Sequence, residues 1–171
     1  SRTLSDRNTR REHDLTPDVR MPSVEDPSAR QVSMFQGIAD LATWDLTIRT
    51  AADQIALAPG NRVHQAIEGD RAVFRYVMDR PARFILSLQS GRYTVARDTW
   101  RDLDGRAVAI EVYHHPSHGY SVAGMLAATK QSLAIFTDAF GPYPLDHLRI
   151  VEFPRYARFA MALPGIVPFS E

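Results

Sequence analysis

From about residue 41, hydrophobic positions alternate with polar ones, which is the pattern of half-buried β-strands. The alternating hydrophobic residues are Trp44, Leu46, Ile48, Ala72, Phe74, Tyr76 and Met78. Further short apolar runs cover residues 55–57, 84–88, 93–96 and 108–112. Turn-forming residues separate them at 59–60, 79–81, 90–91 and 102–105. Because strand follows strand through short turns, this part predicts an antiparallel sheet or sandwich rather than alternating βαβ units.

One helix interrupts the strand pattern. Hydrophobic residues recur three and four positions apart after Ser121, a residue type favoured at the N-cap, and Gly141 followed by Pro142 predicts the end of the helix. The apolar stripe consists of Val122, Met125, Leu126, Ala127, Leu133, Phe136 and Phe140. A stripe this wide needs a sheet to cover it. A short strand over 148–153 and an apolar loop over 154–171 are predicted to follow.

These elements predict an α+β, mainly β fold in three parts. Residues 1–37 are polar, alternate in charge and contain three prolines, which predicts an extended arm or linker. Residues 38–104 form the antiparallel β region, and residues 105–171 form a strand-helix-strand unit. The sequence ends in an apolar, proline-rich loop, so we expect that this last unit is truncated within a larger domain.

Composition excludes several classes of protein. The 171 residues carry 20 basic and 20 acidic side chains, and a net charge of zero argues against a nucleic-acid surface. The chain contains no cysteine, so a zinc ion would need His, Asp or Glu ligands. No apolar run is long enough to span a membrane or to serve as a secretory signal.

The segment 114–118 contains three histidines and is the most obvious candidate for a functional site. His114 and His118 have the spacing of a metal-binding pair on a helix, but Pro116 lies between them and no glutamate follows His114. The residues therefore favour a solvated junction over a metal site. Glu152, at the end of a predicted strand, is expected either to pair with Arg155 or Arg158 or to have a functional role. No hydrolase elbow, Walker loop or dinucleotide fingerprint occurs.

Three segments in order resemble aminopeptidase N-type zinc metallopeptidases, the gluzincin aminopeptidases. They are Val112-Tyr113 with Pro116, the helix end Phe140-Gly141-Pro142-Tyr143-Pro144, and Ile150-Val151-Glu152-Phe153-Pro154. The resemblance covers about residues 41–171 and is strongest after residue 108. It implies that residues 38–104 are the end of an N-terminal sandwich domain. It also implies that residues 105–171 begin a thermolysin-like catalytic domain, upstream of its zinc site.

The resemblance transfers one site residue. Glu171 is placed where the family's Gly-x-Met-Glu-Asn loop has the glutamate that binds the substrate's α-amine, although Pro168 and Ser170 replace the glycine and methionine. The full-length parent is thereby implied to hydrolyse peptide bonds from free N-termini, with zinc as cofactor. The family's zinc ligands, general base and oxyanion-stabilising tyrosine are absent from this chain. We therefore expect the chain to contain no catalytic residue, to bind no stoichiometric zinc and to be inactive.

Residues 151–171 are also similar to a bacterial branch in which the peptidase domain is fused to an ABC transporter permease. This similarity implies a peptide substrate and a membrane-spanning transporter segment in the same parent chain. The parent would then be membrane-associated, with its soluble domain outside the cytoplasm. Two alternatives stay open, a non-catalytic peptide-binding module of a transporter and a plain β-rich interaction domain. Apolar residues between 153 and 169 further predict that the chain forms homo-oligomers.

Overall fold

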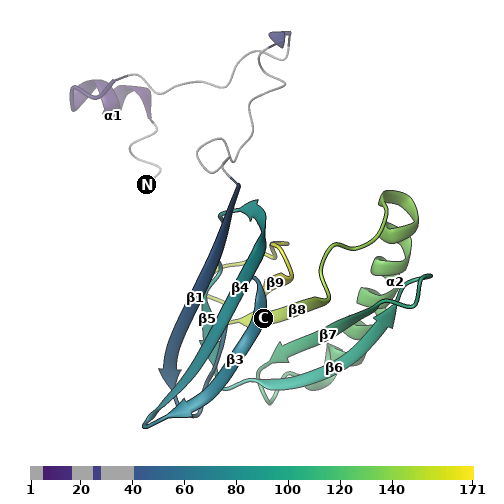
Figure 1. Cartoon of the computed structure of the whole chain (residues 1–171). Coiled ribbons are helices and arrows are strands. Elements are labelled where there is room, and N and C mark those ends of the chain that lie inside the picture. Colours follow the sequence, from purple (N-terminus) through teal and green to yellow (C-terminus); the bar gives the residue numbers. More distant parts are fainter. Residues whose placement is uncertain (1–5, 17–24, 28–40) are drawn as a thin grey trace. The chain divides into compact units, whose positions relative to one another are not determined.

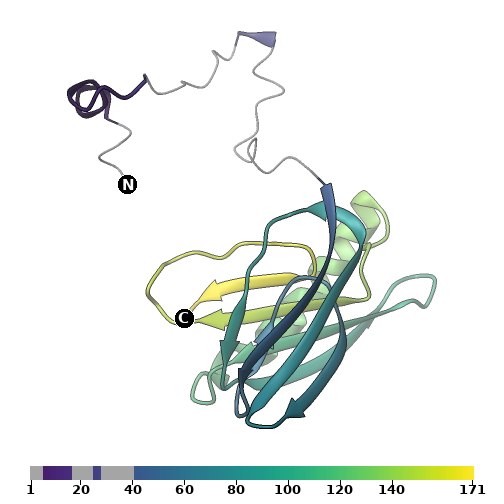
Figure 2. The same cartoon turned by 60° about the vertical axis from the view of Figure 1, so that its left-hand side comes forward.

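The structure is a computed structural model that describes residues 6–16, 25–27 and 41–171 (Figures 1 and 2). The chain divides into two units, residues 1–39 and 40–171. In the first unit, helix α1 (Arg7–Glu12) is capped by the Asp6 carboxylate, which accepts the Asn8 and Thr9 N–H groups at 3.0 and 2.9 Å. An extended arm is therefore the wrong prediction for residues 7–12. Most of the predicted arm over 1–37 lies outside the described residues, and its linker role stays a prediction.

The second unit begins with an antiparallel sheet of three strands in the order β1-β4-β3 (Figure 1). These strands are β1 (Leu41–Ala51), β3 (Asn61–Glu68) and β4 (Arg71–Arg83). A separate antiparallel pair joins β2 (Ile55–Leu57) to β5 (Gln89–Gly91). The alternation in β1 and β4 has the predicted cause, because Trp44, Phe74 and Tyr76 are buried while Asp45 and Arg75 pair on the exposed face.

A four-stranded mixed sheet follows, in the order β6-β7-β8-β9. It consists of β6 (Thr94–Arg101), β7 (Ala107–His114), β8 (His147–Phe153) and β9 (Ile166–Ser170). β6 and β7 are antiparallel, whereas β7, β8 and β9 run parallel. A 3-10 turn η4 (Gly119–Ser121) and helix α2 (Val122–Phe140) connect β7 to β8, which is the crossover that parallel strands require.

Each face of the mixed sheet is covered by a different element. Tyr113, Val151 and Ile166 pack with Leu57, Phe74 and Tyr76 from the first part of the unit. On the opposite face, Val108 and Ile110 pack with Leu133 of α2. Figures 1 and 2 show α2 lying against this sheet on the side away from β1, β3 and β4. Alternate side chains of β7 therefore pack into two different hydrophobic cores, because both faces of this strand are buried.

Four local predictions are wrong, and strand β3 is not predicted. The turn predicted at 90–91 lies inside β5, which pairs with β2. Residues 84–88 form no strand, since the Ile85 N–H donates to the Arg83 carbonyl and turns the chain. The turn predicted at 79–81 lies inside β4, where Pro81 falls in an irregularity of the β1–β4 register. β3 shows no strand pattern in the sequence because most of its side chains, including Val63 and Ile67, are exposed. The loop predicted over 154–171 contains β9, which pairs with the edge of β8.

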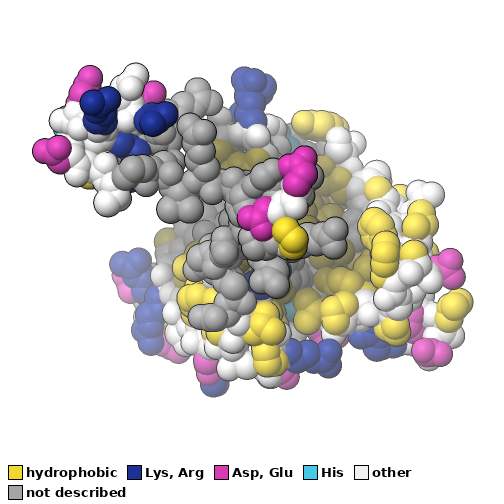
Figure 3. Space-filling view, turned by 90° about the horizontal axis from the view of Figure 1, so that it is seen from above, with side chains coloured by type: hydrophobic (Ala, Val, Ile, Leu, Met, Phe, Trp, Pro, Cys, Tyr) yellow, Lys and Arg dark blue, Asp and Glu magenta, His cyan; other side chains and the backbone are white. Residues whose placement is uncertain are grey.

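Helix α2 has the predicted ends but is only partly covered. It begins at Val122 and ends at Phe140, with Gly141 as its C-cap at a φ of +95° that suits glycine, although the Ser121 side chain makes no capping hydrogen bond. Leu133 is buried, while Ile135, Phe136 and Phe140 are 56, 58 and 83% exposed. Figure 3 shows hydrophobic side chains gathered on the α2 side of the unit. The described helices include none that is long and apolar enough to cross a membrane.

His147 at the start of β8 makes folding stability depend on pH. Burial and the neighbouring Arg149 lower the pKa of His147 below 6.5, against an opposing hydrogen bond with Asp146. The folded state therefore favours the neutral ring. The resulting stabilisation of the fold is present above pH 6.5 and is lost as the pH falls through the lowered pKa. We predict that the free energy of unfolding, measured with urea, decreases less between pH 7 and 5 in His147→Gln than in the unmodified chain. In His64→Gln, which changes an exposed histidine of β3, it should decrease as much as in the unmodified chain. Equal pH slopes in the two variants would contradict this assignment.

Candidate functional site

The chain's candidate site lies where the three parallel strands end. His118 follows β7, Glu152 is near the end of β8, and Glu171 follows β9 directly. Because parallel strands have their carboxyl ends at one edge of the sheet, these three side chains meet there. One potential ligand atom from each lies within 4.8 Å of the other two. We call His118, Glu152 and Glu171 the edge cluster.

Glu152 is the buried member of the edge cluster. It is 5% exposed, one carboxylate oxygen contacts His118 Nδ1, and the other accepts the His115 N–H at 2.8 Å. The structure thus corrects the expected pairing of Glu152 with Arg155 or Arg158. Burial raises the pKa of Tyr93 to about 12, and the negative charge of Glu152 adds to that increase.

Glu171 is the exposed member of the edge cluster. Its carboxylate lies 3.7 Å from His118 Nδ1 and accepts the Arg155 N–H at 3.4 Å, while its own N–H donates to the Phe153 carbonyl at 3.2 Å. Glu171 also lines a concave surface, which encloses a volume of about 460 Å³. The other lining residues are Arg155, Arg158, Phe159, Ala160, Phe169 and Ser170. The edge cluster therefore opens toward solvent on its Glu171 side.

The three histidines of segment 114–118 do not act as one group. His114 ends β7, is buried, and its Nδ1 lies 2.8 Å from the His115 carbonyl oxygen. The His115 ring contacts the Ser117 hydroxyl at 2.7 Å. Only His118 reaches both carboxylates. Sequence spacing missed this arrangement because the partners of His118 are 34 and 53 positions away, and the one signal for it is the parallel order of β7, β8 and β9.

A second buried carboxylate, Glu111 of β7, has a very different environment. It lies 3.3 to 3.5 Å from Arg62, Arg97 and Arg149, and it accepts the Tyr113 hydroxyl at 2.8 Å. Although burial raises it, the Tyr113 hydrogen bond and the three guanidinium groups hold the pKa of Glu111 below its usual range. These ion pairs connect β3 to the mixed sheet, so we assign a structural role to this network.

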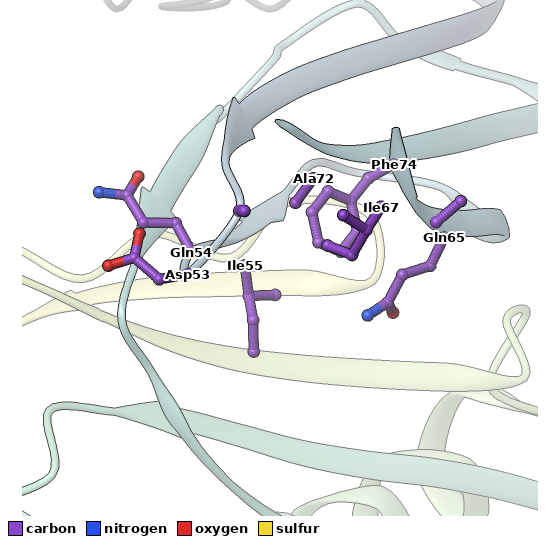
Figure 4. Close-up of a pocket in the computed structure, with 9 residues that line it drawn as sticks. Asp53, Gln54, Ile55, Gln65, Ile67, Ala72 and Phe74 are labelled. Atoms are coloured by element: carbon purple, nitrogen blue, oxygen red, sulfur yellow. The ribbon is translucent and has the colours of Figure 1, made fainter. Parts of the chain in front are cut away.

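A pocket of about 360 Å³ lies elsewhere in the second unit, beside β2 and β4. Figure 4 shows Asp53 and Gln54 at one end and Gln65 at the other, with Ile55 and Phe74 between them. The side-chain Oε1 of Gln54 already accepts hydrogen bonds from the Thr50 and Ser90 hydroxyls at 2.9 and 2.8 Å. The lining contains neither histidine nor a nucleophile beside a base, so we assign it no chemistry.

Searches by sequence identify no relative, since no model of a known protein family and no curated protein matches the chain. Comparison of structures does give matches. Legionella pneumophila aminopeptidase A in complex with aspartic acid matches with a TM-score of 0.68 and 21% identity, over 75% of this chain and 16% of that enzyme. An M1 zinc metallopeptidase from Deinococcus radiodurans, bound to a Tyr-Ser-Ala substrate, matches with a TM-score of 0.62 and 19% identity.

The matched region covers 74% of this chain but only 29% of the Deinococcus enzyme. The second unit therefore has the fold of part of an M1 zinc aminopeptidase, mainly β with antiparallel sheets and similar to the N-terminal domains of these enzymes. This agrees with the family named from the sequence, at the level of the fold. The fusion to a transporter permease stays a prediction from the sequence.

The zinc site implied by the resemblance is not formed by this chain. Its His-Glu-x-x-His motif does not occur among the 171 residues, so the ligand set that such a helix supplies is missing. We therefore assign no step of peptide hydrolysis to the residues of this chain.

Proposed function

We propose that this chain is the part of a zinc-dependent, aminopeptidase-like metallopeptidase that precedes the zinc site. The parent would hydrolyse peptide bonds from free N-termini, and the 171-residue chain alone would be inactive. In this proposal, the β7–α2–β8 unit begins the thermolysin-like catalytic domain. The observation that carries the proposal is the fold match to M1 zinc aminopeptidases over about three quarters of the chain.

The partly exposed face of α2 supports a position within a larger domain. Phe136 and Phe140 expose more than half of their surfaces, as does Ile135, and Tyr156 is 80% exposed near the edge cluster. Apolar surface of this kind marks a contact with another element or another chain. In the proposed parent, the remainder of the catalytic domain covers α2. In the isolated chain, the same surface would favour the homo-oligomers expected from the sequence.

The proposed role of Glu171 is to bind the substrate's α-ammonium group, as the sequence resemblance implies. The carboxylate is partly exposed and borders the concave surface, which suits a charged contact with a peptide end. We predict that Glu171→Gln in the parent raises KM for a free-N-terminus amide about tenfold or more, a loss of about 1.4 kcal/mol. Cleavage of an N-blocked peptide would not decrease.

A matched control for that substitution is Glu68→Gln, which changes an exposed carboxylate paired with Arg49 on β3. It should leave both substrates unaffected. If Glu171→Gln also has no effect on the free-amine substrate, the assignment of the α-amine site to Glu171 is wrong, although the peptidase proposal itself survives.

The alternative is a peptidase-like module that binds peptides without cutting them and serves an ABC transporter. The residues that favour it are Pro168 and Ser170, which depart from the aminopeptidase pattern and lie in strand β9. The proposed permease segment and membrane-associated, extracytoplasmic location rest on the sequence similarity of residues 151–171. Intact zinc ligands in the parent sequence after residue 171 would favour the enzyme, and their loss would favour the binding module.

A further inference from the structure

We propose that the edge cluster binds one divalent transition-metal ion, with His118, Glu152 and Glu171 as its protein ligands. One imidazole nitrogen and two carboxylate oxygens are a ligand set suited to zinc and to similar first-row cations. This site differs from a His-Glu-x-x-His site, because its ligands follow three separate strands rather than one helix turn. The proposal does not depend on peptidase activity.

The charge of the edge cluster is the first argument. Glu152 is as deeply buried as Glu111, but the two carboxylates are neutralised in different ways. Glu111 has three arginines within 3.5 Å. Among the described residues, the one basic side chain within ion-pair distance of the Glu152 carboxylate is His118, which also faces Glu171. The edge cluster thus brings two carboxylates to a single imidazole. Arg155 and Arg158 line the concave surface beside Glu171, but in the described part of the chain neither guanidinium group forms an ion pair with these two carboxylates. A divalent cation would balance both carboxylates.

The geometry is the second argument. In a tetrahedral zinc site, ligand atoms about 2.0–2.2 Å from the metal lie roughly 3.3–3.6 Å from one another. The three side chains already hold such atoms within 4.8 Å of one another, with 3.7 Å between His118 Nδ1 and the Glu171 carboxylate. Binding would replace the direct His118–Glu152 contact with two metal bonds, which requires only a small separation of those side chains.

The surroundings also orient the proposed ligands. The His115 N–H fixes one Glu152 oxygen, and the Arg155 N–H contacts Glu171, so each carboxylate has a backbone donor outside the cluster. Such outer contacts position metal ligands. The concave surface beside Glu171 gives a cation access from solvent and leaves room for water or another ligand.

This inference replaces the expectation that the chain binds no stoichiometric zinc. A cation and a substrate ammonium group would compete for Glu171, so metal binding is best measured without peptide. The experiment is calorimetric titration of the metal-free 171-residue chain with Zn²⁺, with metal analysis after dialysis. Absorption of the Co²⁺-loaded chain reports the coordination geometry. The expected result is one ion per chain, with affinity reduced at least about tenfold in both His118→Gln and Glu171→Gln.

Three variants complete the test. Glu152→Gln should also reduce affinity, and Glu171→Gln keeps the proposal testable if the buried substitution prevents folding. Because glutamine keeps the size of the side chain, Glu171→Gln isolates the effect of the side-chain carboxylate. His64→Gln and Glu68→Gln are the matched controls on β3 and should bind like the unmodified chain. Absence of saturable binding, or equal binding by His118→Gln, Glu171→Gln and the controls, would overturn the proposal.

Discussion

Replacing Glu111 with glutamine should destabilise the chain by about 3–5 kcal/mol, the range for breaking a buried ion pair by removing one partner. Glu111 is 8% exposed, and Arg149 beside it is 4% exposed. The amide of glutamine keeps the shape of the side chain but not its charge. Arg149 and the half-buried Arg62 would then be left without a counter-ion in a site where desolvation is costly.

The measurement is equilibrium urea unfolding at neutral pH, with Glu68→Gln as the matched control. That variant removes the carboxylate of the exposed Arg49–Glu68 pair, which should change the free energy of unfolding by less than about 1 kcal/mol. A loss in Glu111→Gln no larger than in Glu68→Gln would show that the buried network does not stabilise the packing of β3 on the mixed sheet.

Gly60→Ala should destabilise the chain by roughly 2–4 kcal/mol, because two costs combine at this position. The φ of Gly60 is +110°, a conformation that side chains disfavour, and an added Cβ would lie 2.8 Å from the Val77 carbonyl oxygen. Since that oxygen belongs to the backbone of β4, it cannot move aside easily. The Gly60 carbonyl also accepts the Arg149 Nη1 hydrogen bond at 2.8 Å, so a shift here would disturb the Glu111 network.

Gly124→Ala is the opposite case and the matched control. Gly124 lies in α2, and an added Cβ would meet nothing within 4 Å. Alanine is favoured over glycine in a helix interior, so this variant should be more stable by about 0.5–1 kcal/mol. Thermal or urea unfolding of both variants checks the pair. Equal effects in the two variants would mean that the close contact at Gly60 is not maintained in solution.

The sequence predicts most of the fold where side chains have one buried face. Trp44, Phe74 and Tyr76 alternate with exposed residues, so β1 and β4 are evident from the pattern alone. β7 is evident as an apolar run although both of its faces are buried, and Ser121 and Gly141 mark the two ends of α2. β3 gives no such signal because its hydrophobic residues Val63 and Ile67 lie on the exposed side. Its position depends on pairing with β4, which local periodicity does not encode.

The edge cluster shows why the site is harder to predict than the fold. His118 and Glu152 are each visible in the sequence as polar residues at a strand end, but neither indicates its partner. Their meeting requires β7 and β8 to be parallel, and that follows from the crossover through α2. Glu171 joins them only because residues 166–170 pair with β8 as a third parallel strand rather than forming a loop.

The most direct test of the proposed function compares two proteins, the 171-residue chain and its parent extended past Glu171. Both are assayed with zinc and with a chelator, on a free-N-terminus chromogenic amide and on an N-blocked peptide. We predict that only the extended protein cleaves, that it prefers the free-amine substrate, and that chelation abolishes its activity. Zinc-dependent turnover by the 171-residue chain, or an extended protein that is inert with zinc, would contradict the proposal.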